Sequence, residues 1–214
     1  MVASVTAALL AVRRRQLGWG ATTHERTSAL PGDELVPNAD LVATRSIAIN
    51  ATPDDIWPWI AQLGQDRGGF YSYDRLESVV VANIHSVDRV VADRAVTAVG
   101  DAVHLAPEVA LEVAVLEPGR ALVLRTGTGM GPLPAPYDFT WAFVIVRAPD
   151  GRTRLVVRER YRYRTAWAGM LVEPLTAVSF VMSRKMLRGI RVRAEAASQQ
   201  QAHAAAPTPP APAR

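Results

Sequence analysis

Glu159 is the residue whose type and position could best support chemistry in this chain. It lies within residues 153–164, which alternate strictly between two kinds of side chain, as in a β-strand whose successive side chains point to opposite faces. A carboxylate on an apolar strand face either finds a charged partner or exchanges protons as an acid–base catalyst. Glu159 is therefore a candidate catalytic residue, and a structural ion pair is the favoured alternative. The residues that share its face are Thr153, Leu155, Val157, Tyr161 and Tyr163.

His85 is the second catalytic candidate, with Ser86 and Asp88 close to it in the sequence. A histidine near a loop at a pocket mouth can transfer protons near neutral pH. A lone histidine is more often a hydrogen-bonded structural residue, so this alternative stays open. No second histidine lies at ligand spacing and cysteine is absent, so we expect neither a metal site nor a cofactor.

Aromatic residues supply the expected wall of a ligand cavity. Those that follow Gly68 and Gly69 could form a mobile lid, or equally a turn whose rings fill the core. Trp141 lies between Phe139 and Phe143 on one strand face, which suits a core or a cavity wall. The expected ligand-binding residues are Phe70, Tyr71, Tyr73, Trp141, Phe143, Tyr161, Tyr163 and Met182.

The opposite face of residues 153–164 is a ladder of arginines. We expect it to be a solvated outer face, although it could also dock anionic lipid headgroups or a protein partner. The remaining basic residues are scattered, and no aromatic-studded basic module is present, so nucleic acid is not an expected partner. The arginine ladder and its one valine are Arg154, Val156, Arg158, Arg160, Arg162 and Arg164.

The 214 residues, 49% of them hydrophobic, are enough for one domain with its own core. Val2 to Arg15 is an apolar run followed by three arginines, about half the length of roughly 20 apolar residues that a bilayer span needs. It is expected to be a surface helix or, alternatively, a peripheral membrane anchor. The expected location is cytoplasmic. If the segment is an anchor, it would contact the inner face of the membrane.

The order of expected elements indicates an α+β fold. A strand at 44–50 precedes a helix capped by Thr52 and Pro53, then a second short helix capped by Asp74. Hairpin-length turns join strands at 101–105, 111–116, 121–126, 138–147 and 153–164, so their pairing is antiparallel. A long helix follows, and Pro174 marks either its start or a kink.

Changes in composition along the chain indicate the domain boundaries. Residues 1–15 are a separate apolar and basic segment, and 16–43 form an extended arm packed on the domain. Residues 44–195 form the folded domain, while the Ala- and Pro-rich tail at 196–214 is expected to be disordered. The C-terminal helix should cover the apolar face of the sheet, with a pocket between them.

Several segments resemble an uncharacterised, largely actinobacterial subgroup of the SRPBCC superfamily, which includes START domains, the birch-pollen allergen family and polyketide cyclases. The segments are LGWGAT at 17–22, LPGD at 30–33, WPW at 57–59, GGFYSYD at 68–74, IHS at 84–86, RERY at 158–161 and MSRKML at 182–187. The resemblance implies a helix-grip fold: a curved antiparallel β-sheet wrapped around a long C-terminal α-helix, with two short helices after the first strand. It also implies a hydrophobic cavity, but it transfers no catalytic residue.

Three functions remain in competition at this point. The favoured one is binding of a small hydrophobic ligand, of lipid, polyketide or isoprenoid type, between the sheet and the C-terminal helix. The second is a polyketide cyclase/dehydratase-like enzyme in which Glu159 acts with Tyr161 or His85. The third is a membrane-surface or partner-binding protein that uses the N-terminal segment and the arginines.

Overall fold

A computed structural model gives the arrangement of the chain and describes residues 2–65, 67–71, 87, 89–130 and 135–205. Its helices are α1 (Val2–Leu17), α2 (Thr23–Thr27), α3 (Pro53–Ala61) and α5 (Ala168–Ala205), with 3-10 turns η1 (Asp33–Leu35) and η2 (Ala92–Arg94). Its strands are β1 (Leu41–Ile49), β2 (Ala102–Ala106), β3 (Val109–Glu117), β4 (Ala121–Met130), β5 (Tyr137–Arg147) and β6 (Thr153–Tyr163).

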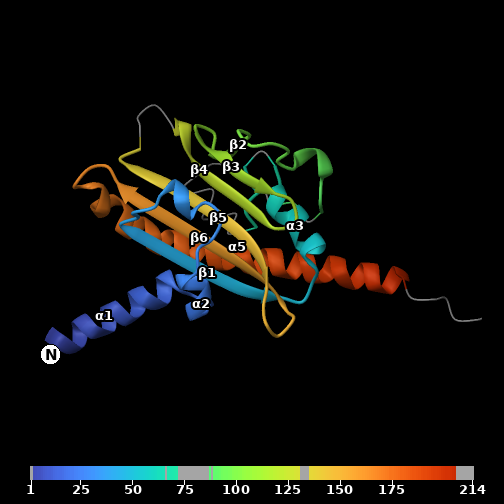
Figure 1. The fold of residues 1–214 in the computed structure, drawn as a ribbon, viewed down its shortest axis with the longest axis horizontal. Helices are drawn as coiled ribbons and strands as arrows, with labels where there is room; N and C mark the ends of the chain where they lie inside the picture. The colour runs from blue at the N-terminus through green and yellow to red at the C-terminus, as the bar shows by residue number, and fades with distance from the viewer. Residues whose placement is uncertain (1, 66, 72–86, 88, 131–134, 206–214) are drawn as a thin grey trace, which may run out of the picture.

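The six strands form one antiparallel sheet in the order β1-β6-β5-β4-β3-β2. Helix α5 lies along one face of this curved sheet, and its C-terminal end continues past the sheet (Figure 1). The main core fills the space between them, where side chains such as Leu155, Val157 and Phe143 meet Leu187 and Ile190 of the helix. This arrangement confirms the expected α+β helix-grip class.

Helix α5 is longer at both ends than its hydrophobic pattern required. It begins at Ala168, so Pro174 lies inside the helix rather than at its start. It continues through Ala205, so the prediction of disorder from residue 196 onward is wrong as far as residue 205. The reason is that residues 196–205 are mostly Ala and Gln, which favour helix, and no proline interrupts this segment until Pro207.

The early elements match the expectation with small shifts. Strand β1 begins at Leu41, a few residues before the expected start, and β4 runs through Met130, beyond the expected end at residue 126. Helix α3 has the expected N-cap at Thr52, and the structure shows that it is part of a capping box, in which the Thr52 side chain accepts from the Asp55 amide and Asp55 bonds back to Thr52. The expected second short helix, capped by Asp74, lies outside the described residues.

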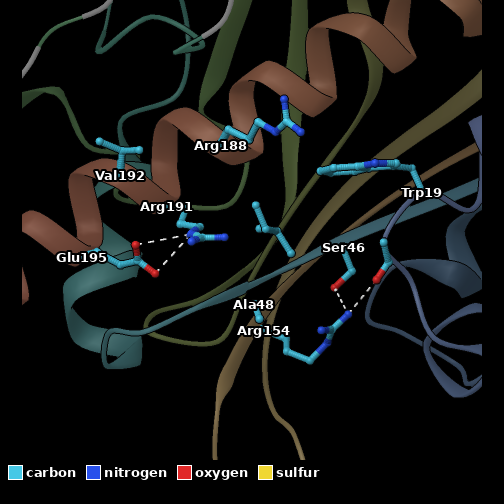
Figure 2. A pocket seen from close by; sticks show the side chains of 10 residues that line it. Trp19, Ser46, Ala48, Arg154, Arg188, Arg191, Val192 and Glu195 are labelled. Atoms are coloured by element: carbon cyan, nitrogen blue, oxygen red, sulfur yellow. Dashed lines mark hydrogen bonds and ion pairs between the residues drawn. The ribbon is translucent and has the colours of Figure 1, made fainter.

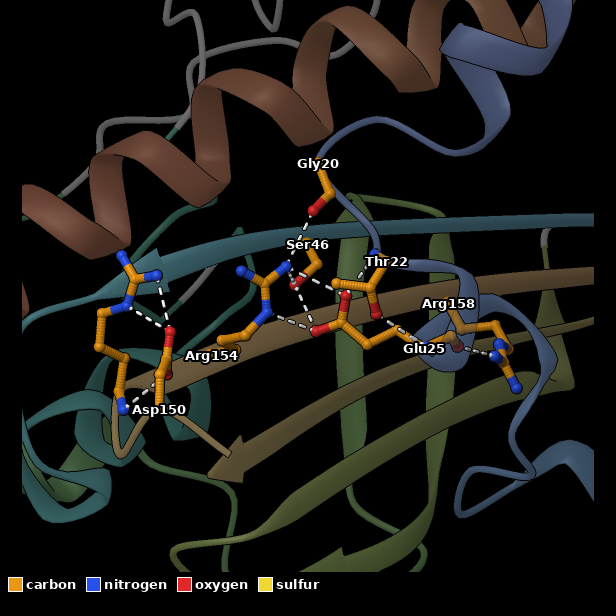
Figure 3. A network of polar contacts seen from close by, with 8 residues as sticks. Gly20, Thr22, Glu25, Ser46, Asp150, Arg154 and Arg158 are labelled. Atoms are coloured by element: carbon orange, nitrogen blue, oxygen red, sulfur yellow. Dashed lines mark hydrogen bonds and ion pairs between the residues drawn. The ribbon is translucent and has the colours of Figure 1, made fainter. Parts of the chain in front are cut away.

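The segment between α1 and β1 packs on the sheet face opposite α5. Leu30 joins a small cluster with Val123 and Val144 on the outer side of β4 and β5. Farther along the sheet, helix α2 lies over β1 and β6, where Glu25 is buried against their side chains (Figure 3). The sheet is therefore covered on both faces, by α5 on one and by this arm on the other.

The arm corrects the interpretation of the arginine ladder. Arg158 is buried and Arg154 and Arg160 are half-buried, so only Arg162 and Arg164 of the five arginines are exposed as a solvated face requires. Carboxylates and carbonyls of the arm hold Arg154, Arg158 and Arg160. Arg160, for example, donates to the carbonyls of Val36 and Pro37 at 2.9 Å each. The alternation was right, but the face it defines is an intramolecular interface.

Helix α1 leaves the body of the molecule at its N-terminal end (Figure 1). Its last turns contact α5, where Arg13 pairs with Glu173 and Gln16 donates to Thr176 at 3.2 Å. Among the described residues, neither α1 nor any other helix is both long and apolar enough to cross a membrane.

Candidate functional site

A buried ion pair lies on the inner face of the sheet, between the sheet and α5. Arg45 of β1 and Glu159 of β6 are almost fully buried, and Arg45 Nη1 is 2.6 Å from Glu159 Oε1. Two serines one helical turn apart on α5 donate to the same oxygen, Ser179 at 2.6 Å and Ser183 at 3.2 Å. Glu159 thus has a charged partner, the arrangement expected of a structural pair.

One terminal oxygen of Glu159 and one terminal nitrogen of Arg45 have no hydrogen-bond partner among the described residues. Glu159 Oε2 and Arg45 Nη2 are both inaccessible to solvent and unpaired, although each group is otherwise fully engaged. Leaving such atoms without a partner in the interior is costly, so native proteins nearly always satisfy them. The pair therefore presents one acceptor and one donor toward the interior.

Aromatic rings surround this pair. Trp141 of β5 is directly opposite Glu159 in the strand register, and Phe139 is opposite Tyr161. Phe139 and Tyr161 lie 4.6 Å apart between ring centroids, and Trp141 contacts both Phe143 at 4.8 Å and Phe70 at 6.1 Å. Trp141 Nε1 is another buried donor with no partner among the described residues. Four of the expected ligand-binding residues therefore belong to the main core or pack against it: Phe70, Trp141, Phe143 and Tyr161.

Burial keeps the phenol of Tyr161 protonated. Loss of solvent is the largest cause that raises its pKa well above the usual value, and the nearby Glu159 carboxylate raises it further. A neutral phenol beside a carboxylate can donate a hydrogen bond but cannot serve as a base near neutral pH.

The other expected ligand residues lie apart from the pair or outside the description. Tyr71 packs edge-on against Trp59, bonds to Gln62 and lies under Arg193, while burial raises its pKa to about 12. Its φ of 53° marks the strained turn that follows the double glycine. Tyr163 lies at the end of β6, and Met182 is half-buried on α5. Tyr73 and the second catalytic candidate, His85, lie outside the described residues.

Sequence reasoning did not single out Arg45, Ser179 or Ser183. A signal for Arg45 was present, since it shares the parity of Ile47 and Ile49 in the first strand and so had to point inward with them. The serines lie four residues apart on the face of α5 that also carries Met186. One strand carries a single cation on its apolar face and another carries a single carboxylate, so the two could have been predicted to form an ion pair.

A second polar network fixes the arm to the outer face of the sheet (Figure 3). Arg154 holds the Glu25 carboxylate with two bonds, of 2.6 Å and 3.0 Å, and also donates to Ser46 and the Gly20 carbonyl. Burial raises the pKa of Glu25, but the bonds and charge of Arg154 and the Thr22 amide outweigh it, so the net pKa is lowered from its ordinary value. This carboxylate is therefore most stabilising when ionised.

The depressed pKa predicts an acid-sensitive arm. The stabilisation by Glu25 is complete above its unfolded-state pKa and is lost as the pH falls through the lower folded-state value. We expect amide exchange in the arm, corrected for intrinsic rates, to stay slow from neutral pH to about pH 5 and to accelerate below that. Glu25→Gln should accelerate exchange at neutral pH and flatten the profile. Identical profiles for both proteins would contradict the assignment.

Among the described residues, no group of three or more His, Asp or Glu side chains is placed to hold a metal ion. What the interior arrangement offers is hydrogen bonding and apolar contact: one charged pair with an open acceptor and donor, set in an aromatic and aliphatic wall.

No family model and no curated protein matches the sequence. Solved structures do match in fold. A hypothetical protein from Helicobacter pylori has a TM-score of 0.50 at 13% identity, with 81% of this chain and 99% of that one covered. The di-domain ARO/CYC protein of the steffimycin biosynthetic pathway has a TM-score of 0.42 at 12% identity, with 80% and 55% covered. Truncated norcoclaurine synthase from Thalictrum flavum has a TM-score of 0.42 at 14% identity, with 69% and 91% covered. At such identities the likeness concerns the fold alone.

Proposed function

We propose that this protein binds a small hydrophobic ligand between the inner face of the sheet and α5. The observation that carries the proposal is the buried Arg45–Glu159 pair, in which one acceptor atom and one donor atom have no hydrogen-bond partner among the described residues. A ligand hydroxyl could donate to Glu159 Oε2 and accept from Arg45 Nη2. A lipid, polyketide or isoprenoid with one such group suits this chemistry.

The direct test is native mass spectrometry of the protein purified from its own host, with identification of any released small molecule. We expect a stoichiometric hydrophobic adduct, and Trp141→Ala should lower its occupancy by about tenfold because a large aromatic contact is lost. Trp167→Ala is the matched control, since Trp167 is 55% exposed and lies outside the inner face. An empty wild-type protein, or equal losses in both variants, would contradict the proposal.

A cyclase/dehydratase-like activity is a second candidate, favoured by the neutral Tyr161 phenol beside a carboxylate. In that reaction Tyr161 would donate a hydrogen bond to a substrate carbonyl, and Glu159 would accept a proton from the adjacent carbon. The ion pair with Arg45 supports the binding role over this one, because it engages Glu159 in the folded protein. Once a ligand is known, Glu159→Gln separates the two roles, because a glutamine oxygen can still accept a hydrogen bond from the ligand but cannot take up a proton. Conversion would stop, while binding would be weakened but retained.

Contact with a membrane surface is a third role, supported by apolar side chains left uncovered on two helices. Leu9 and Leu10 of α1 are 65% and 53% exposed, beside Arg14 and Arg15. A short apolar segment next to cations binds anionic bilayers weakly and reversibly. The outer side of α5 adds further exposed apolar residues, with Trp167 just before it: Met170, Leu171, Leu175, Val178 and Val181.

Vesicle flotation tests this role. The double change Leu9→Ser and Leu10→Ser should reduce binding to phosphatidylglycerol vesicles at least about tenfold, since two leucines no longer enter the interface. Val99→Ser is the control, because Val99 is 62% exposed but lies on neither helix. Binding that does not change in the double variant would exclude α1 as the contact.

A further inference from the structure

A pocket of about 570 Å³ lies outside the core, where the arm, the edge strand β1 and the C-terminal half of α5 meet (Figure 2). Its base is made of small residues: Gly20 from the arm, and Ser46 and Ala48 from β1. Gly20 has a φ of 70°, and a Cβ there would lie 2.1 Å from the Ser46 carbonyl oxygen, so only glycine allows this close approach. The pocket therefore exists because the residues at its base have small side chains or none.

Two arginines of α5 lie against Trp19, and one of them, Arg188, lines this pocket. The guanidinium carbons of Arg184 and Arg188 are each 5.7 Å from the ring centre of Trp19, and both arginines are exposed. Neither forms an ion pair or hydrogen bond with another described residue. Like charges one helical turn apart repel each other, and the indole face offsets this only in part. The excess positive charge here has no acidic partner within the described part of the chain.

The single carboxylate in the pocket wall does not neutralise these arginines. Glu195 is engaged by Arg191, at 3.2 Å from its Nε, and by the backbone amide of Asn50 at 2.9 Å. Arg154, at the other side of the pocket, is likewise matched by Glu25. Figure 2 shows Arg191 joined to Glu195 by dashed lines, and Arg188 farther along the helix toward Trp19. Once these matched pairs are set aside, the charges of Arg184 and Arg188 remain.

The edge of β1 adds a backbone donor. The Ser46 amide donates away from β6, to the Trp19 carbonyl at 3.0 Å. Because peptide groups alternate along an antiparallel strand, the amide of Ala48 also points away from β6, toward the pocket side of the edge. The Ala48 amide and the Arg188 guanidinium therefore line the same pocket as donors without a matching acceptor among the described residues, and Arg184 adds a second positive charge one helical turn away.

We propose that this pocket binds the phosphate group of an anionic ligand. Guanidinium groups bind phosphate oxygens with paired, charge-assisted hydrogen bonds, and a tetrahedral phosphate can meet donors from α5 and from β1 at once. A planar carboxylate has only two oxygens to share among these donors. The phosphate could belong to a soluble organic phosphate or to a lipid headgroup, and the site is independent of the ligand proposed for the interior.

The test is isothermal titration of the full-length chain with inorganic phosphate in a low-salt chloride buffer. Arg188→Gln should weaken binding about tenfold, the loss typical of one charge-assisted contact. Arg162→Gln is the matched control, because it removes the same charge from an exposed position on the far face of the sheet. Ala48→Leu should abolish binding by filling the base of the pocket without altering any charge, and circular dichroism verifies that each variant is folded.

Parallel flotation with phosphatidylcholine vesicles, with and without phosphatidylglycerol, distinguishes the sources. A drop in anionic-vesicle binding for both Arg188→Gln and Ala48→Leu identifies a lipid headgroup, whereas vesicle binding equal to wild type together with lost phosphate binding identifies a soluble phosphate. Equal weakening by Arg162→Gln and Arg188→Gln would show diffuse surface attraction and overturn the proposal. So would phosphate binding that survives Ala48→Leu, or a protein that binds neither probe.

Discussion

Replacing Arg45 by methionine should destabilise the folded chain by about 3–5 kcal/mol. The guanidinium of Arg45 is the charged partner of Glu159, at 2.6 Å, and both side chains are almost fully buried. Methionine fills similar space but leaves the buried Glu159 carboxyl group without its charged partner, with only the two serine hydroxyls bonded to it. Urea unfolding followed by circular dichroism measures the effect, with wild type and variant compared at the same pH.

The double variant Arg45→Met, Glu159→Leu makes this prediction specific. Removing both charges avoids the unpaired carboxylate, so stability should return to within about 1 kcal/mol of wild type or exceed it. Ser183→Ala provides a mild control, since Glu159 Oε1 would retain Arg45 and Ser179. If the double variant is as unstable as the sum of the two single variants, the pair is not the interaction that stabilises this face. A double variant that is stable yet empty of ligand would link the pair to binding.

The strands could be predicted from the sequence because their signal is local. Residues 153–164 alternate over the whole of β6, and the hairpin turns before it fix antiparallel pairing with its sequence neighbours. The inward direction of Glu159 followed from that alternation alone. Its partner did not, because Arg45 is 114 residues away and pairing across that separation depends on how β1 returns to the edge of the sheet.

The arginine ladder shows where pattern reasoning stops. Alternation separates the two faces of a strand, but it cannot tell whether water or another segment covers a charged face. The arm supplies the cover here, through the Glu25 carboxylate and backbone carbonyls such as that of Pro37. Acidic residues in the arm were a usable signal, since Glu25 and Asp33 stand in a segment expected to lie on the domain. Residues 196–205 were predicted to be disordered because they lack large apolar residues, but their high alanine content favours helix even without apolar packing.

Arg158→Met should cost about 3–5 kcal/mol of unfolding free energy, mainly by releasing the arm. Arg158 is 2% exposed, and its guanidinium ties three parts of the chain together. It donates to Thr44 Oγ1 on β1 and to the Ser28 carbonyl at 3.0 Å each, and it also bonds the Glu25 carbonyl and the Asp33 carboxylate. Methionine can replace its aliphatic stem but none of these bonds, so buried acceptors on the arm would lose their donor.

The exposed neighbour Arg162 provides the control for this prediction, because Arg162→Met removes the same charge from the same strand at a solvated position. We expect that control to change stability by less than about 0.5 kcal/mol. Limited proteolysis locates the effect: cleavage in residues 18–40 should accelerate strongly in Arg158→Met while β5 and α5 stay protected, because their mutual contacts do not involve Arg158. Uniform loss of protection across the chain would instead show that the arm is inseparable from the sheet, with Arg158 acting as part of a single core.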